Sequence, residues 1–284
     1  TINVLKALFM IKYVLEIESN IDNITSLMIE NIDDDRITVK AKVEEALKVL
    51  MRQMLVQKNG SLYVFLTDEE QEINREIDSQ NVEMAEVINK VSEMIFEDIF
   101  TDKKYRYPAF NGRYSFGFNQ AVDDRPYKAN QGYDFGLRIL TPWYEGGNDE
   151  TTLRMMSGQG REVLVVLPND TAFLDEIRQY LKIEKFLRLN TSTQLAKYET
   201  IKEAKRVEMR ERNANAKLYL TESLKEATIY VNGDTVRTSA KEVTGRINES
   251  IGRLVQIVYN KLSYIDAAYG EAEIRKMFHS TNQL

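Results

Sequence analysis

The sequence contains no cysteine, and this absence removes two classes of chemistry at once. A disulfide framework is excluded, and so is a thiolate acting as nucleophile or metal ligand. Histidine is nearly absent as well, because His279 is the only one. Neither a histidine-based catalytic triad nor a histidine-rich zinc site is therefore expected. For a chain without disulfides, the cytoplasm is the default location.

Long apolar runs are also missing. No stretch approaches the roughly 20 residues needed to cross a bilayer, so we expect no membrane association. The opening TINVLKALFMIKYVLEIE is interrupted by acids and is followed by no small-residue cleavage site, so a signal peptide is not expected. Since the chain opens at Thr1, without Met and directly in a helical pattern, we expect it to be a piece of a longer protein.

A nucleotide-binding loop is the third absence. Such a loop would read GxxxxGK[ST], so that backbone amides surround the phosphate and the Lys reaches its charge. The glycine clusters here are EGGNDETT (145–152) and SGQGRE (157–162), and neither contains Gly-Lys-Ser/Thr. Both clusters are predicted to be turns, and no cofactor or metal site is expected in this segment.

What the chain does carry is charge, unevenly distributed. The net charge of −6 argues against a protein that binds polyanions with its whole surface, but it leaves room for a local basic patch. Residues 1–80 hold 9 Lys/Arg and 15 Asp/Glu, residues 81–190 hold 14 and 17, and residues 191–284 hold 15 and 12. The basic end is thus the C-terminal third.

The first 80 residues show the element order of a winged helix. Apolar spacing and breaks predict helices over 2–19, 22–31 and 39–53, then a hairpin, then a helix from Thr67. Asn59-Gly60 is expected to form a type I′ turn with positive φ at both residues. Thr67 with Glu70 forms a predicted capping box. The expected N-caps of the second and third helices are Asp22 or Asn23, and Thr38.

The rest of the chain is predicted to contain a mixed module and a helical one. Residues 81–190 begin with an amphipathic helix (82–100), turn aromatic and strand-like, and then give the central strand EVLVVLP and another helix, which is typical of an α+β module. Residues 191–284 are predicted to contain a long polar helix to 226, a hairpin around Asn232-Gly233 and a helix over 240–266. The expected fold is α+β and predominantly helical, with modules 1–80, 81–190 and 191–284.

Two sets of cations are candidate binding residues. The winged helix could contact double-stranded DNA, but Glu44 and Glu45 lie on the same helix, and a protein–protein or intramolecular role of this module is slightly favoured. The long helix is polar nearly all round, as in helices that contact a partner. The candidate DNA contacts are Lys40, Lys42, Lys48, Arg52, Lys58 and Asn59, and the candidate partner-docking residues are Lys202, Lys205, Arg206, Arg210 and Arg212.

Two further features have a structural and a functional interpretation. The stretch RYSFGFNQ shares Phe-Gly-Phe with RNA-recognition strands, whose exposed aromatics stack on bases, but inward packing is favoured. Asp123, Asp124 and Arg125, with Asp134, could belong to an enzyme site, but adjacent strand residues point to opposite faces. An Asp–Arg pair fixing a turn is therefore the favoured interpretation.

Several phrases, taken in order, carry a resemblance to a known family. They are TINVLKALFMIKYV, QKNGSLYVFLTDEEQEINREI, FNQAVDDRP, GLRILTP, VLVVLP, RERN and NKLSYI. No single phrase is a specific motif. Their collinear order resembles the large P-loop protein of BREX (bacteriophage exclusion) defence systems, the BrxC/PglY family, over essentially the whole chain.

The resemblance implies a role without catalysis in this segment. In that family an AAA+-like ATPase module, which binds ATP, precedes a segment like this one, and its nucleotide-binding loop has no counterpart here. The implied function is assembly with other BREX subunits or copies of itself, with DNA contact as a further role. Two alternatives stay open: a stand-alone interaction scaffold, and an enzyme centred on the α+β module.

Overall fold

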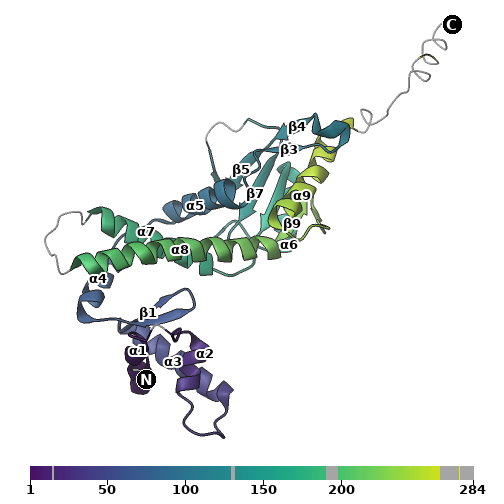
Figure 1. Cartoon of the computed structure of the whole chain (residues 1–284). Coiled ribbons are helices and arrows are strands. Elements are labelled where there is room, and N and C mark those ends of the chain that lie inside the picture. Colours follow the sequence, from purple (N-terminus) through teal and green to yellow (C-terminus); the bar gives the residue numbers. More distant parts are fainter. Residues whose placement is uncertain (15, 129–131, 190–197, 263–274, 276–284) are drawn as a thin grey trace. The chain divides into compact units, whose positions relative to one another are not determined.

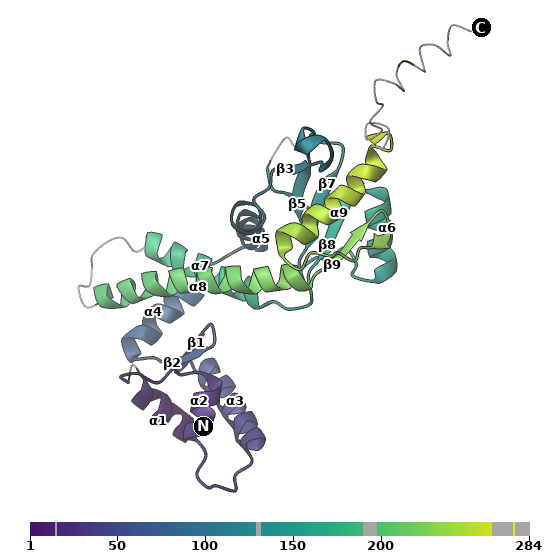
Figure 2. The ribbon, with the colours of Figure 1, turned by 45° about the vertical axis from the view of Figure 1, so that its right-hand side comes forward.

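A computed structural model of the chain describes residues 1–14, 16–128, 132–189, 198–262 and 275. It is a mixed α+β protein in which helices predominate (Figures 1 and 2). The chain divides into two compact units, one built from residues 1–87 and 172–219 and the other from residues 88–171 and 220–284. The three-module division is a different partition of the chain and stays a prediction. His279 lies outside the described residues.

The first unit opens with three helices, a hairpin and a fourth helix, in the predicted order. Apolar side chains of all three opening helices and of the first strand form one core: Val4, Leu8, Ile24, Val43, Ala46, Leu47, Leu50 and Val56. The elements are α1 (Ile2–Ile11), α2 (Ile21–Leu27), α3 (Arg36–Arg52), β1 (Val56–Asn59), β2 (Leu62–Phe65) and α4 (Asp68–Asp78).

The caps of these helices were predicted correctly in one case and wrongly in two. Thr67 and Glu70 form the capping box at the start of α4. Helix α3 begins before Thr38, because Asp35 is the N-cap and accepts hydrogen bonds from the Thr38 amide and hydroxyl. In α2 the N-cap is Asn20, whose side chain accepts from the Asn23 amide. Each true cap lies two or three residues earlier in the chain.

The two Asn-Gly pairs make different turns. In the first hairpin Asn59 pairs with Leu62, so the turn residues are Gly60 and Ser61, and of these only Gly60 has a positive φ (+58°). The predicted type I′ turn is therefore wrong here, and the glycine takes the first central position, as in type II′ turns. In the second hairpin Asn232 and Gly233 themselves form the turn, with φ of +50° and +85°, as type I′ requires.

Two helices from later in the chain complete the first unit. Helices α7 (Ala172–Leu189) and α8 (Glu199–Glu226) lie side by side (Figures 1 and 2). A second apolar cluster joins them to α4: Ile73, Ile77, Ile183 and Phe186, with Ile201 and Met209 packed against it. Residues 190–197, part of the predicted long helix, lie outside the described residues.

The second unit is built on a six-stranded mixed sheet. Its strand order is β10-β9-β8-β7-β5-β6, with β5, β7 and β8 parallel and the remaining pairs antiparallel. The central strand β8 is buried on both faces, which explains its continuous apolar run, whereas β7 carries the half-buried Arg138 between buried apolar residues. The strands are β5 (Asn119–Val122), β6 (Arg125–Pro126), β7 (Gly136–Leu140), β8 (Glu162–Val166), β9 (Thr228–Val231) and β10 (Asp234–Thr235).

Three helical segments accompany this sheet. Helix α5 (Met84–Glu93) continues into a π-helical turn (Met94–Ile99), and α9 (Val243–Val258) contacts β8 and β9. Helix α6 (Glu150–Gln159) begins inside the first glycine cluster and ends inside the second, so the prediction of turns was wrong for the parts of both clusters that it covers. Its N-cap, Asp149, accepts from the Thr152 amide. The predicted helix 240–266 is described only to residue 262.

A separate two-stranded ribbon pairs β3 (Lys104–Arg106) with β4 (Ser115–Gly117). The ribbon belongs to the second unit and contacts α9 through β3. Among the described residues, no helix is both long enough and apolar enough to cross a membrane.

Candidate functional site: a hairpin held by the long helix

The first hairpin and the long helix meet along a row of polar contacts within the first unit. Gln57 and Asn59 lie on the same face of β1, because side chains alternate along a strand. The Gln57 carbonyl oxygen accepts from Asn74 Nδ2 (2.8 Å) and Lys205 Nζ (3.2 Å), and its amide donates to Glu208. Asn59 Nδ2 donates to Glu211 Oε2 at 2.7 Å. The hairpin is thus bound to helix α8 rather than presented to solvent.

Arg212 is the centre of this contact. Its side chain is buried, and its guanidinium donates to Glu176 Oε1 on α7 (3.1 Å), to Glu208 Oε1 (3.0 Å) and to the backbone carbonyl of Lys58 (2.8 Å). The planar fork of an arginine suits several fixed acceptors at once. One side chain therefore ties α7, α8 and the hairpin together.

Lys205 is the second buried cation. It is only 5% exposed and forms an ion pair with Glu208 at 2.7 Å. We call the group Gln57, Asn59, Glu176, Lys205, Glu208 and Arg212 the hairpin–helix site. A cavity of about 270 Å³ lies beside it, with Met51, Met54, Ile77 and Ile183 among its apolar lining residues. Asn74 and Gln179 add amide groups to the wall.

The charges of the hairpin–helix site balance. Burial by itself would raise the pKa of Glu208, but the charges of Lys205 and Arg212 and their hydrogen bonds outweigh it and lower that pKa. Two carboxylates face two cations, so each buried charge has a partner. Asn59 Oδ1 and Glu176 Oε2 are buried without a hydrogen-bond partner among the described residues.

The structure brings members of the two predicted sets together. The backbone carbonyl of Lys58, predicted to touch DNA, accepts from Arg212, predicted to dock a partner. Asn59 donates to Glu211, and Lys205 donates to Gln57 of the same strand. The side chain of Lys58 is exposed and lies over the Tyr63 ring, 5.8 Å from its centroid. Lys205 and Arg212 are thus turned toward the hairpin of their own chain, and the docking of a partner by this helix stays a prediction.

The remaining predicted residues lie outside this site. On α8, Arg206 and Arg210 are exposed, and Lys202 pairs with Glu199 at 3.6 Å. Two of the four candidate cations on α3 form local ion pairs, since Lys40 pairs with Asp22 at 3.0 Å and Lys48 lies 3.6 Å from Glu45. Lys42 and Arg52 are exposed.

The acidic group proposed for an enzyme is dispersed. Asp123 accepts from the Thr141 amide and hydroxyl, Asp124 pairs with Arg138 at 3.1 Å, and Asp134 accepts from the Tyr259 hydroxyl. The predicted pairing of these aspartates with Arg125 is wrong, because Arg138 of β7 takes that place. Burial raises the pKa of Asp123. Each carboxylate thus has a separate partner, and within the described part of the chain no cluster of three metal-ligating side chains occurs.

Sequence reasoning missed the acceptors of the hairpin–helix site. Gln57, Glu176 and Glu208 are ordinary polar residues when considered singly. A signal does exist on α8, where Lys205, Glu208, Arg212 and Asn215 recur every three or four residues and share one side of the helix. Asn215 lies against Gly60 of the hairpin, since a Cβ added to Gly60 would lie 2.7 Å from Asn215 Nδ2. A polar stripe of this regularity indicates a polar partner surface.

Comparison with known proteins places the chain in a family. Residues 80–254, more than half of the chain, match the model described as BREX ATP-binding protein BrxC 4th domain with six-stranded beta sheet. The mixed sheet of the second unit has six strands, in agreement with that description. No solved structure matches the chain. The chain therefore belongs to the BrxC family of BREX phage-defence proteins and contains the fourth domain of that family.

Proposed function

We propose that this chain is a non-catalytic segment of a BREX protein, and that it joins its fourth domain to the part of the polypeptide that precedes it. The family match starts at residue 80, yet α7 and α8 from within the match form one compact unit with residues 1–87. Two helices of the matched region thus pack with the segment that precedes it in the sequence. ATP would be bound elsewhere in the full protein, which we expect to act in the cytoplasm.

The observation that carries this proposal is the position of Arg212. It is buried, belongs to the matched region, and donates to the backbone of Lys58, which precedes that region. Its partners Glu176 and Glu208 are held by charge, and the hairpin–helix site contains no exposed nucleophile. Such an arrangement holds elements together and favours transmission of a conformational state over chemistry.

The experiment compares Arg212→Met with Arg210→Met in the complete BREX protein. We expect Arg212→Met to increase hydrogen exchange at the β1–β2 amides while β7 and β8 stay protected, and to abolish restriction of phage in a plating assay. Arg210 is exposed on the same helix, so its variant should restrict phage normally. Full restriction by Arg212→Met with an exchanging hairpin would refute the joining role.

We further propose that α8 docks other BREX subunits through its exposed side. Membership of the family supports such partners, and Arg206 and Arg210 remain outward after Lys205 and Arg212 are used internally. Light scattering of the chain and of Arg206→Glu/Arg210→Glu tests the version in which the partner is a second copy. A monomer in both cases would exclude self-association at this surface.

Duplex-DNA contact by residues 1–80 is the second proposed function. The order of three helices and a hairpin supports a winged-helix assignment, and Lys42 and Arg52 are exposed on α3. The hairpin, however, is occupied by α8 through Asn59. Titration with duplex DNA at low and high salt tests this function, and loss of binding in Lys42→Gln/Arg52→Gln is the supporting result.

A further inference from the structure

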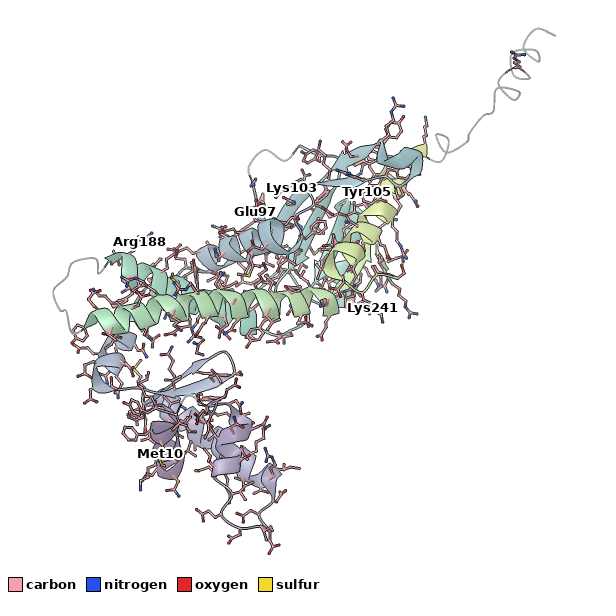
Figure 3. All side chains as sticks on the ribbon, viewed as in Figure 1. Met10, Glu97, Lys103, Tyr105, Arg188 and Lys241 are labelled. Atoms are coloured by element: carbon pink, nitrogen blue, oxygen red, sulfur yellow. The ribbon has the colours of Figure 1, made fainter. Side chains whose placement is uncertain are left out.

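The β3–β4 ribbon has one covered face and one open face. Tyr105 and Phe116 are directly opposite each other in the ladder and share the covered face. The Phe116 ring lies 4.8 Å from the ring of Tyr259, and the Tyr105 hydroxyl lies against Gly252 of α9 (Tyr105 is labelled beside α9 in Figure 3). The other face therefore carries Lys104 and Arg106 on β3, opposite Gly117 and Ser115 on β4.

A tyrosine ring lies on this open face. Tyr133 packs directly over Gly117, because a Cβ added to Gly117 would overlap its ring. The backbone of Tyr133 is held by Asn119, whose side chain donates to the Tyr133 carbonyl (3.0 Å) and accepts from the Tyr133 amide (3.1 Å). Tyr133 is still 48% exposed. An aromatic ring fixed on a glycine and open to solvent forms a platform beside Lys104.

The open face is basic in a chain that is acidic overall. Residues 101–118 contain four Lys/Arg and one Asp, while the whole chain carries −6. Lys104, Arg106 and Arg113 are exposed, and none of the three forms an ion pair within the described part of the chain. The neighbouring Lys103 is different, because Glu97 pairs with it at 3.2 Å (both are labelled in Figure 3). The single acid of the stretch, Asp102, accepts from Asn248.

We propose that the open face of the β3–β4 ribbon binds single-stranded nucleic acid, with one base stacked on Tyr133 and phosphates on Lys104 and Arg106. Cations next to an aromatic platform are the combination that recognises an unpaired strand, because every base has a π-face and every nucleotide a phosphate. A duplex keeps its bases stacked and would leave the platform unused. This surface is independent of the hairpin–helix site, so the proposal stands apart from the proposed function.

The ribbon also revises the RNA-strand alternative drawn from Phe-Gly-Phe. Phe116 packs on Tyr259, and Phe118 is buried between Phe100 and Phe135, so neither phenylalanine can stack on a base. The favoured prediction of inward packing holds for both rings. The functional residue of the Phe-Gly-Phe stretch is Gly117, because its missing side chain makes room for the exposed ring of Tyr133.

The test measures binding of labelled oligo-dT, oligo-U and a short duplex to the 284-residue chain across a range of salt. Lys104→Gln/Arg106→Gln should flatten the salt dependence, by about 0.7 in log–log slope for each phosphate of a single strand that is no longer neutralised. Tyr133→Ala should weaken binding about tenfold, because it removes the ring on which one base stacks. Tyr133→Phe should bind normally, because it keeps the ring.

Two controls separate this surface from general charge and from misfolding. Gly117→Ala displaces the Tyr133 ring without changing any charge, so it should weaken binding as Tyr133→Ala does. Lys6→Gln/Lys241→Gln, at two exposed lysines outside every candidate site, removes two positive charges elsewhere and should leave single-strand binding intact. Circular dichroism and thermal melting establish that each variant is folded.

The proposal fails under any of four results. These are no binding to either oligonucleotide, an equal loss of duplex and single-strand binding in Lys104→Gln/Arg106→Gln, equal weakening in Lys6→Gln/Lys241→Gln, or displacement of the oligonucleotide by polyglutamate as effective as by unlabelled oligonucleotide. Preference for oligo-dT or for oligo-U would support it equally, and would identify DNA or RNA as the natural strand.

Discussion

Two small β-ribbons, β1–β2 and β3–β4 among the described residues, are similar in length and differ in which face is left open to solvent. In β1–β2 the polar face is covered by α8, and Gln57 and Asn59 direct their hydrogen-bonding groups to Lys205, Glu208 and Glu211. In β3–β4 the aromatic face is covered by α9, and the face that bears cations stays in solvent. The charged residues of a ribbon do not reveal from sequence whether they can bind a partner. That depends on which face of the ribbon is covered by a helix of the same chain.

The same comparison explains why β1–β2 is suited to joining elements of its own chain and β3–β4 to binding an external anion. A buried ion pair is costly to desolvate, and it persists where each charge has a partner, as around Arg212. Exposed cations keep their hydration and stay available to an anion, as Lys104 and Arg106 do. Four sets of substitutions would break or sharpen this contrast, and they follow from the largest expected effect to the smallest.

Replacing Arg212 with Met should destabilise the protein most. The change leaves Glu176 buried without its cation and Glu208 with Lys205 alone, and breaking a buried pair in this way costs about 3–5 kcal/mol. The free energy of unfolding, measured by urea denaturation followed by circular dichroism, checks this value. Arg210→Met, at an exposed site on the same helix, should change it by no more than about 0.5 kcal/mol. Equal effects of the two variants would contradict the central position of Arg212.

Adding a methyl group to one glycine of each ribbon distinguishes the two. Gly60→Ala should cost about 1–2 kcal/mol, since Gly60 has a φ of +58° and its new Cβ would press on Asn215. Gly117→Ala should cost about 1 kcal/mol or less, because Gly117 has no positive φ and only the Tyr133 ring must move. Thermal melting of the two variants measures the difference, and the reverse order would be incompatible with the contacts described.

Acid should loosen the first ribbon. The pKa of Glu208 is lowered in the folded protein, because Lys205 and Arg212 outweigh its burial, so its charge adds stability above the ordinary glutamate pKa of about 4.3. That stability is lost as the pH falls through the lowered value. Exchange of the β1–β2 amides should therefore accelerate there, and Glu208→Gln should remove this part of the pH dependence. Glu203→Gln, on the exposed side of α8, is the matched control.

Releasing Lys103 and Lys128 from Glu97 should slightly strengthen the binding of nucleic acid by the β3–β4 ribbon. Tyr127, Lys128 and Lys103 bind Glu97 and lower its pKa to about 2, so Glu97 is charged at every physiological pH. Glu97→Gln frees both lysines at little cost in stability, because ion pairs on the surface contribute little. We expect a steeper salt dependence of oligonucleotide binding, by about 0.7 in slope for each further phosphate neutralised. An unchanged slope would limit the surface to Lys104 and Arg106.

Local features of this chain could be predicted where the interacting residues lie within about one helical turn of each other in the sequence. Thr67 and Glu70 are three residues apart, so the capping box was visible. The N-caps of α2 and α3 were misplaced by a few residues, because several polar side chains near each start could accept the same amide. Helix α6 was missed since the glycines at its ends obscured the short helix between them.

Distant contacts could not be predicted in the same way. Strand β9 was assigned to a C-terminal module, yet it pairs with β8 of the six-stranded sheet, more than 60 positions earlier, with Val231 opposite Val163. Arg212 meets Lys58 across 154 positions. A local pattern predicts that a strand or a polar stripe exists, but the partner is chosen by which surfaces can be buried together.

The sequence by itself determined the mixed, mainly helical fold, the hairpin positions and the family to which the chain belongs. Those properties follow from periodicity, turn residues and the order of short phrases, each of which is written along the chain. Only the tertiary structure decided which charges are internal and which are open. Lys205 and Lys104 are the same residue type, and their roles differ because a carboxylate of the same helix lies 2.7 Å from one and solvent surrounds the other.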